Sequence, residues 1–191
     1  MSAIARYFKH IGKNVSGYDK TPSPLTRELE SEGIEIHYED RPDLIPFNVE
    51  KTFIVYTPAI PETLGEFQFV KENGYSMCKR SRMLGEIARA KECHPVAGTH
   101  GKTTTSGLLA HIFQDSKVGC SAFLGGIAKN YDTKLLVSTN TTIVVEADEF
   151  DRSFLQLYPN IAIITSADAD HLDSYGTAEE MRSAFEAFAS Q

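Results

Sequence analysis

The stretch VAGTHGKTTTSGLLAHIF, residues 96–113, decides the fold that we expect. An apolar segment at 93–98 leads into a turn with two glycines, and a segment with helical spacing follows the turn. Glycine turns allow backbone N–H groups to converge on an anion, and the N-terminus of the next helix adds its dipole. We therefore expect a phosphate-binding loop between a strand at 93–98 and a helix at 102–114.

The loop differs from the common pattern G-x-x-x-x-G-K-[ST]. Val96 stands five residues before Gly101, so the leading glycine is Gly98 and the loop is shortened or shifted. A glycine-rich turn without a ligand is the alternative interpretation. The Gly-Lys-Thr string between a strand and a helix favours phosphate binding. The candidate residues are Gly98, Thr99, His100, Gly101, Lys102, Thr103 and Thr104.

Two later segments, 141–147 and 160–166, are rich in β-branched residues, as parallel strands buried on both faces are. Acidic residues follow them: Glu146 ends the first strand, and Asp168 comes just past the second. Ligands of open parallel sheets bind beyond the carboxyl ends of the strands. We therefore expect these carboxylates to meet the phosphate loop at one edge of one sheet.

A magnesium ion prefers a few hard oxygen ligands, and a nucleotide needs such an ion to neutralise its phosphates. Thr103 and Glu146 are the candidate magnesium ligands. His171, beside Asp170, is a candidate ligand of a second metal ion, although imidazole is a poor first choice for magnesium. A solvated acidic surface is the alternative interpretation of the carboxylates.

Strands and helices alternate along the chain, which predicts an α/β fold with mainly parallel sheets. A charge difference suggests a domain boundary near residue 92, giving domains 1–92 and 93–191. A Rossmann-like domain opens with a strand and a glycine-rich turn, whereas this chain opens with a helix. Either the first strand is missing or the domain is of another type. Helices are expected at 1–11, 24–33, 61–74, 80–91, 102–114 and 177–190, and strands at 14–19, 34–38, 52–60, 75–78, 93–98, 117–126, 141–147 and 160–166.

Composition limits the classes of partner. The 191 residues are 41% hydrophobic and carry a net charge of −7, most of it in residues 93–191. An acidic chain argues against general nucleic-acid binding. Three cysteines without a Cys-x-x-Cys pair favour a reducing cytoplasm. The apolar runs are too short for a signal peptide or a membrane span, so we expect a cytoplasmic protein without a membrane partner.

Longer strings resemble the Mur ligase family of peptidoglycan synthesis. They are residues 96–113, VVEADEFDRSFLQLYPNIAIITSADADHLDSYGT at 144–177, and LGG at 124–126. Weaker matches lie in MSAIARYF (1–8), VSGYDKTPSPLT (15–26), TPAIP (57–61) and KRSRMLGEI (79–87). The resemblance covers essentially the whole chain, and the amino-terminal matches are similar to the family's uridine-nucleotide domain.

The resemblance implies a Rossmann-like UDP-sugar domain at 1–92 that lacks its first strand, followed by part of a P-loop-type ATP-binding domain at 93–191. Within the family, the chain is most similar to members that join L-alanine to the carboxylate of UDP-N-acetylmuramate through an acyl phosphate. ATP and Mg²⁺ would be the cofactors. Gly98–Thr104 would form the ATP loop, and Lys102 would be the phosphate lysine and candidate catalytic residue. Thr103, Glu146 and His171 would bind metal, with Asp19 and Arg80 as candidates on the UDP-sugar side.

The family pattern also includes an opening Gly-x-Gly-Gly turn and a third domain, which this chain does not match. We therefore expect the chain by itself to have little or no ligase activity. Two alternatives stay open: a sister ligase acting on a muropeptide or another amino acid, and a non-enzymatic nucleotide-binding module. The residues do not indicate an oligomeric state.

Overall fold

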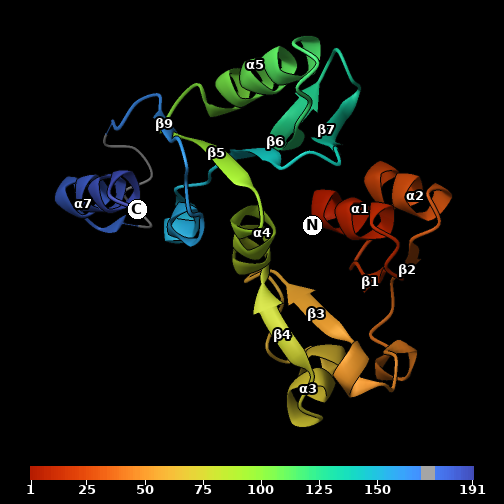
Figure 1. Cartoon of the computed structure of the whole chain (residues 1–191). Coiled ribbons are helices and arrows are strands. Elements are labelled where there is room, and N and C mark those ends of the chain that lie inside the picture. Colours follow the sequence, from red (N-terminus) through yellow and green to blue (C-terminus); the bar gives the residue numbers. More distant parts are fainter. Residues whose placement is uncertain (169–174) are drawn as a thin grey trace. The chain divides into compact units, whose positions relative to one another are not determined.

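The computed structural model describes residues 1–168 and 175–191, and the chain divides into two compact units, Met1–Met83 and Leu84–Gln191. Figure 1 labels the elements of both units. The division falls within α4, Arg80–Arg89. The domain boundary near residue 92 stays a prediction.

The first unit alternates helices and short strands, as the sequence predicts. Before α4 its elements are α1 Ser2–His10, β1 Ser16–Tyr18, α2 Pro24–Ser31, β2 Glu35–His37, the 3-10 helices η1 Pro42–Leu44 and η2 Val49–Lys51, β3 Phe53–Tyr56, α3 Gly65–Glu72 and β4 Ser76–Lys79.

The strands of the first unit form two separate parallel pairs, β1–β2 and β3–β4. In the Rossmann order 3-2-1-4-5, these pairs correspond to strands 3-2 and 4-5. The position between them belongs to the first strand of that fold. The topology of these two parallel pairs therefore agrees with a Rossmann-like unit.

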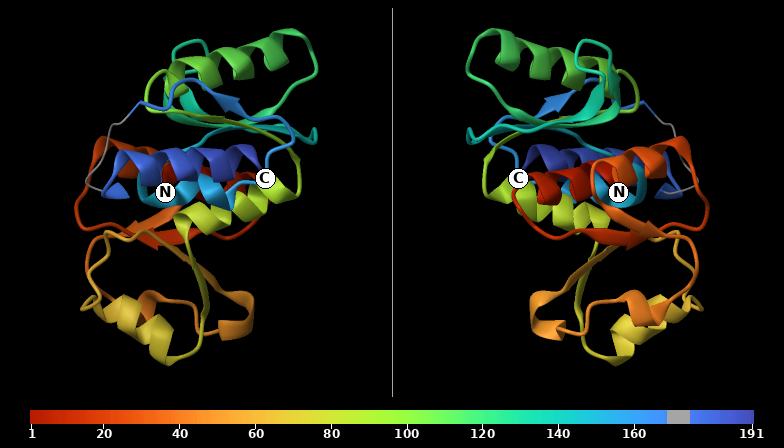
Figure 2. Two further views of the ribbon diagram at one scale, coloured as in Figure 1. Left: turned by 90° about the vertical axis from the view of Figure 1, so that its left-hand side faces the viewer. Right: turned by 90° about the vertical axis from the view of Figure 1, so that its right-hand side faces the viewer.

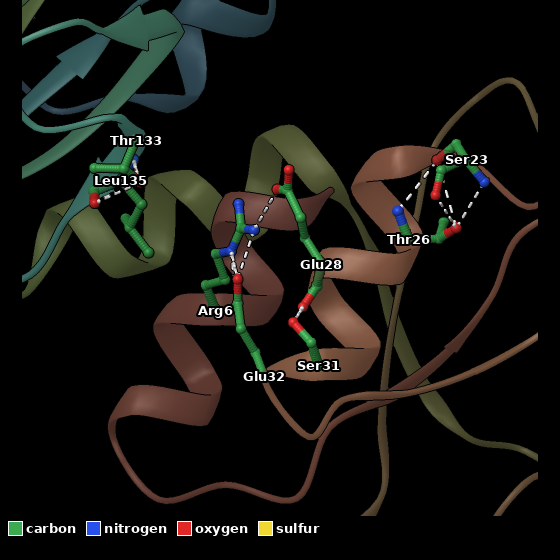
Figure 3. A network of polar contacts seen from close by, with 8 residues as sticks. All are labelled: Arg6, Ser23, Thr26, Glu28, Ser31, Glu32, Thr133 and Leu135. Carbon is green, nitrogen blue, oxygen red and sulfur yellow. Dashed lines mark hydrogen bonds and ion pairs between the residues drawn. The ribbon is translucent and has the colours of Figure 1, made fainter.

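Polar contacts join α1 to α2 (Figure 3). Arg6 Nη2 lies 2.7 Å from Glu32 Oε1 and 3.1 Å from Glu28 Oε2, and hydrogen bonding to Glu32 raises the pKa of Arg6. At the start of α2, Ser23 and Thr26 form a capping box in which each side chain accepts from the other's backbone N–H. These bonds fix the first turn of α2 and its place beside α1.

The second unit is built on a five-stranded sheet in the order β7-β6-β8-β5-β9. All pairs are parallel except β6–β7, which is antiparallel. Its elements are β5 Glu92–Ala97, α5 Lys102–Asp115, β6 Ser121–Ala128, β7 Thr133–Leu136, β8 Thr142–Glu146, η3 Phe150–Gln156, β9 Ile163–Ile164 and α7 Ala178–Ala189.

Helices cover both faces of this sheet. Figures 1 and 2 show α5 on one face and α7 with η3 on the other. Beneath α5 the core consists of Ala110, Cys120, Ala122, Leu124 and Val144. On the other face Phe154 stacks on Phe188 of α7, with ring centroids 4.9 Å apart. The strands β5 and β8 are therefore largely buried between helices on both faces of the sheet.

The strands differ locally from the expectation. Strand β7 was not expected from the sequence, and the strand expected at 160–166 is only the two-residue edge strand β9, where Ile164 is 39% exposed. In α5 the large apolar residues do not all face the sheet. Leu108 and Ile112 are exposed, whereas Ser106 and Ala110 are buried against the sheet. Small residues on that face allow the helix to approach the strands closely.

Among the helices that the structure describes, none is long and apolar enough to cross a bilayer.

Candidate nucleotide site

The predicted loop lies where the sequence places it. Strand β5 ends at Ala97, and Gly101 is the N-cap of α5, whose first residue is Lys102. Gly98 and Gly101 have φ values of +136° and +79°, which favour glycine. Because α5 begins directly after the turn, its N-terminal N–H groups and dipole face the loop.

The loop is fastened to the segment that follows β9. Ser166 accepts from the His100 N–H at 3.0 Å through Oγ and from the Thr99 N–H at 3.1 Å through its carbonyl. The hydroxyls of Thr99 and Ser166 are 2.7 Å apart, and Thr165 Oγ1 donates to the carbonyl oxygens of Ala97 and His100. Ser166 was not among the predicted site residues, because its place beside the loop follows from the pairing of β5 with β9 in the folded sheet.

The two candidate magnesium ligands lie together. Glu146 ends β8, which pairs with β5 so that Glu146 lies opposite Val96. Thr103 Oγ1 donates to Glu146 Oε1 at 2.9 Å, and the N–H of Gly125 donates to Glu146 Oε2 at 2.7 Å. Ser106 Oγ also donates to Glu146 Oε2, at 3.3 Å.

This donor set fits a magnesium ion. A carboxylate and a hydroxyl are hard oxygen ligands, and Glu146 is only half-buried. Gly125 leaves the space that the carboxylate occupies, since a Cβ there would lie 2.1 Å from Glu146 Oε1. Within residues 1–168 and 175–191, no group of three or more His, Cys, Asp or Glu side chains is arranged to hold a metal. The third candidate ligand, His171, lies outside the described residues, as does Asp170.

Lys102 has an unexpected partner. Its Nζ donates to Gly98 O at 2.6 Å and to Glu149 Oε1 at 2.9 Å, with a longer contact of 3.4 Å to Thr99 O. Glu149 is the N-cap of η3 and is 2% exposed. Glu149 stands three residues after Glu146 in the string VVEADEFD, but the string does not predict which of its carboxylates is buried.

The remaining candidates are more peripheral. Thr104 is exposed on the first turn of α5, and Asp168 is exposed while its N–H donates to Thr99 Oγ1 at 3.3 Å. In the first unit, Asp19 follows β1 and accepts from the Thr21 N–H at 3.2 Å. Arg80 is the exposed first residue of α4, directly after β4. The residues Asp19 and Arg80 thus follow strands of different parallel pairs.

The site consists of a glycine turn between a central parallel strand and a helix, a lysine at the start of that helix, and a carboxylate at the end of the neighbouring strand. These features define a P-loop-type α/β protein. The chain belongs to the Mur ligase family. The family's catalytic-domain model matches residues 1–92, and its middle-domain model matches residues 96–191.

Two curated relatives carry the same name. A UDP-N-acetylmuramate–L-alanine ligase from Flavobacterium psychrophilum is 56% identical over 191 residues, covering 99% of this chain and 43% of that protein. A ligase of the same name from Parabacteroides distasonis is 55% identical over 194 residues, covering 100% of this chain and 42% of that protein. The chain therefore spans less than half the length of these relatives.

Solved structures agree on the fold. The UDP-N-acetylmuramate-alanine ligase of Thermotoga maritima superposes with a TM-score of 0.84 at 28% identity, covering 100% of this chain and 44% of that one. A UDP-N-acetylmuramate:L-alanyl-gamma-D-glutamyl-meso-diaminopimelate ligase from Neisseria meningitides gives 0.89 at 22% identity, covering 100% and 64%. At that lower identity the likeness supports the fold alone.

Proposed function

We propose that this chain carries the nucleotide-binding and UDP-sugar-binding parts of an ATP-dependent ligase that joins L-alanine to UDP-N-acetylmuramate. The observation that carries the proposal is the meeting of Lys102, Thr103 and Glu146 at the carboxyl ends of β5 and β8. The name shared by relatives at about 55% identity supports the choice of substrates.

In this function the sugar's carboxylate attacks the γ-phosphorus of ATP, which yields an acyl phosphate and ADP. The amino group of L-alanine then attacks the acyl carbon, and phosphate leaves as the amide forms. Both reactants are anions, so their repulsion must be cancelled before they meet. Lys102, the N–H groups of the loop and the α5 dipole would supply positive charge at fixed positions.

Thr103 and Glu146 are the residues that would hold a magnesium ion, and His171 is proposed as a further ligand. Such an ion, when bound, neutralises charge on the phosphate oxygens. The hydrogen bonds from Gly125 and Ser106 keep the Glu146 carboxylate oriented toward Thr103. Gly98–Thr104 together are proposed as the ATP loop.

The first unit is proposed to bind the UDP sugar. Asp19 and Arg80 follow the carboxyl ends of β1 and β4, where ligands of open parallel sheets bind. Domains 1–92 and 93–191 are proposed because the net charge of the sequence changes near residue 92. We also propose a cytoplasmic location, since Cys93 and Cys120 are free thiols, as a reducing compartment allows.

Nucleotide binding is tested on the 191-residue chain by titration calorimetry with Mg-ATP. Lys102→Ala should weaken ATP binding about tenfold or more, because a hydrogen bond to a charged group contributes roughly 1.5–3 kcal/mol. The matched control is Lys134→Ala, which removes an exposed lysine of β7 and should leave affinity unchanged. Equal affinities for the two variants would exclude the loop as the phosphate site.

Ligase activity is tested by substituting this chain for the matching segment of the Flavobacterium psychrophilum relative. Phosphate release should require both UDP-N-acetylmuramate and L-alanine, and Lys102→Ala should abolish it. Release with a muropeptide or another amino acid instead of L-alanine would support the sister-ligase alternative. ATP binding without any phosphate release would support a non-enzymatic binding module.

A further inference from the structure

Lys102 is held by two firm bonds and one loose contact. An ammonium group has three N–H donors. The bonds to Gly98 O at 2.6 Å and to Glu149 Oε1 at 2.9 Å have ordinary lengths for a charged donor. The contact with Thr99 O at 3.4 Å is beyond the usual range of N–H···O bonds. Two donors therefore fix the position of Nζ, and the third is weakly used.

Glu149 depends on Lys102 for its charge compensation. Its side chain is 2% exposed, and Oε2 is buried with no hydrogen-bond partner in the part of the chain that the structure describes. A buried carboxylate that loses its cation keeps an uncompensated charge. Lys102 can therefore release Thr99 O at little cost, whereas releasing Glu149 would leave both carboxylate oxygens without a hydrogen bond from any residue that the structure describes.

The two glutamates near the loop have different surroundings. Glu146 is half-buried, and hydroxyl and N–H donors contact both of its oxygens. Glu149 is inside the protein, where Lys102 binds one oxygen and Tyr175 donates to its backbone carbonyl at 2.5 Å. The backbone of Glu149 is thus also fixed, so its carboxylate is a rigid support for the lysine.

We propose that Glu149 is a positioning residue for Lys102. Glu149 and the Gly98 carbonyl fix the position of Lys102 Nζ beside the loop. The N–H donor that now points at Thr99 O then turns to a phosphate oxygen of the nucleotide. Lys102 keeps its bond to Glu149 when the nucleotide binds. This inference rests on the proposed function, because it requires that the loop binds phosphate.

The test is a double-mutant cycle on the 191-residue chain with two probes, Mg-ATP and inorganic triphosphate. Glu149→Gln keeps the shape of the side chain but removes its charge, and Lys102→Met removes the ammonium. Glu149→Gln alone should weaken both probes about tenfold, in line with the loss of one charge-assisted bond. In the Lys102→Met background the same substitution should change affinity less than twofold, because Glu149 acts through the lysine.

Two further variants keep the result interpretable. Glu186→Gln removes an exposed carboxylate of α7 and should leave both affinities unchanged. Glu149→Asp retains the charge but is one methylene shorter, so it should fall between the wild type and Glu149→Gln; it replaces Glu149→Gln in the cycle if that variant does not fold. Urea midpoints of all variants show which ones are folded.

The affinities and urea midpoints together distinguish a positioning role of Glu149 from a purely structural one. A purely structural Glu149 would lower the urea midpoint while leaving the affinity of the folded protein unchanged, and this would overturn the inference. An equal loss of affinity with and without Lys102 would overturn it as well. If the wild-type chain binds neither ATP nor triphosphate, the proposed loop function itself fails, and the inference fails with it.

Discussion

At the residue scale, Gly98 is more constrained than Gly101, the other glycine of the loop. Its φ of +136° is rare for residues with a side chain. A Cβ at this position would lie 2.1 Å from Thr165 Oγ1 and 2.9 Å from the Ser166 nitrogen. The position therefore requires glycine for two independent reasons, backbone conformation and space.

We expect Gly98→Ala to lower the free energy of unfolding by about 2–4 kcal/mol, combining left-handed strain with overpacking. Urea denaturation followed by circular dichroism measures this change. Gly107→Ala in α5 is the control, because nothing lies within 4 Å of its added Cβ. That variant should gain about 0.5–1 kcal/mol from helix propensity, and equal effects of the two would refute the steric argument.

The buried thiols lead to a second prediction at this scale. Burial raises the pKa of Cys93 to about 12 and that of Cys120 to about 11. Since the thiolate is the reactive form, both thiols should react with an aromatic disulfide reagent at pH 8 far more slowly in the native protein than in urea. Absorbance of the released thiol measures the rates. Rapid labelling of native Cys93 would contradict its burial.

The raised pKa values also predict how stability changes with pH. The folded state keeps thiol protons that the unfolded state loses near pH 8.5. This contribution to stability is fully present below that pH and is lost as the pH rises toward 11–12. Urea midpoints across this alkaline range should therefore fall.

At the scale of elements, the sequence predicts the positions of helices better than it predicts the lengths of strands or which face of a helix is buried. The helices of the first unit and α7 begin with caps or follow an apolar stripe, so local chemistry determines them. Strand β9 is shorter than expected, because β-branched residues do not indicate whether a strand is central or at an edge of the sheet. In α5 the small residues Ser106 and Ala110 face the sheet, whereas Leu108 and Ile112 are exposed. The sequence does not predict this orientation, because the larger apolar residues would be expected to face the core.

The candidate site shows the same limit. Lys102 and Thr103 could be predicted because they follow a glycine turn in the chain itself. Glu146 could be predicted because it ends a β-branched strand. Glu149 and Ser166 could not, since their roles depend on contacts with residues 47 and 67 positions away.

The capping box of α2 leads to a prediction for an element. Ser23 Oγ accepts from the Thr26 N–H at 3.1 Å (Figure 3). Ser23→Ala should therefore lower the stability of the first unit by about 1 kcal/mol. Ser31→Ala is the control, because Ser31 is the exposed last residue of α2 and its Oγ donates to the carbonyl oxygen of Glu28 in the preceding turn. Its effect should stay within roughly 0.5 kcal/mol, and a larger loss for Ser31→Ala than for Ser23→Ala would contradict the assignment.

At the scale of the whole molecule, the two units are stabilised unequally. The second has one five-stranded sheet with helices on both faces, whereas the first has two separate two-stranded pairs. Two-stranded sheets are marginal without packing partners. The core strands of the second unit should therefore open least often.

We expect amide hydrogen exchange to be slowest in β5 and β8 and markedly faster in β1 and β2. Mass spectrometry after pulse labelling measures the difference. Binding of Mg-ATP should slow exchange in the loop and the start of α5 without protecting β1. Equal protection of all strands would show that the chain opens as one cooperative body.

The position of β5 has a consequence for biosynthesis. This strand lies between β8 and β9, and both partners are translated well after it. During translation, β5 and the glycine turn therefore stay without their partners until residue 166 has emerged from the ribosome and can bond to the turn. Nascent chains halted before that point should be open to proteases around residues 93–101, and those released beyond it should resist them.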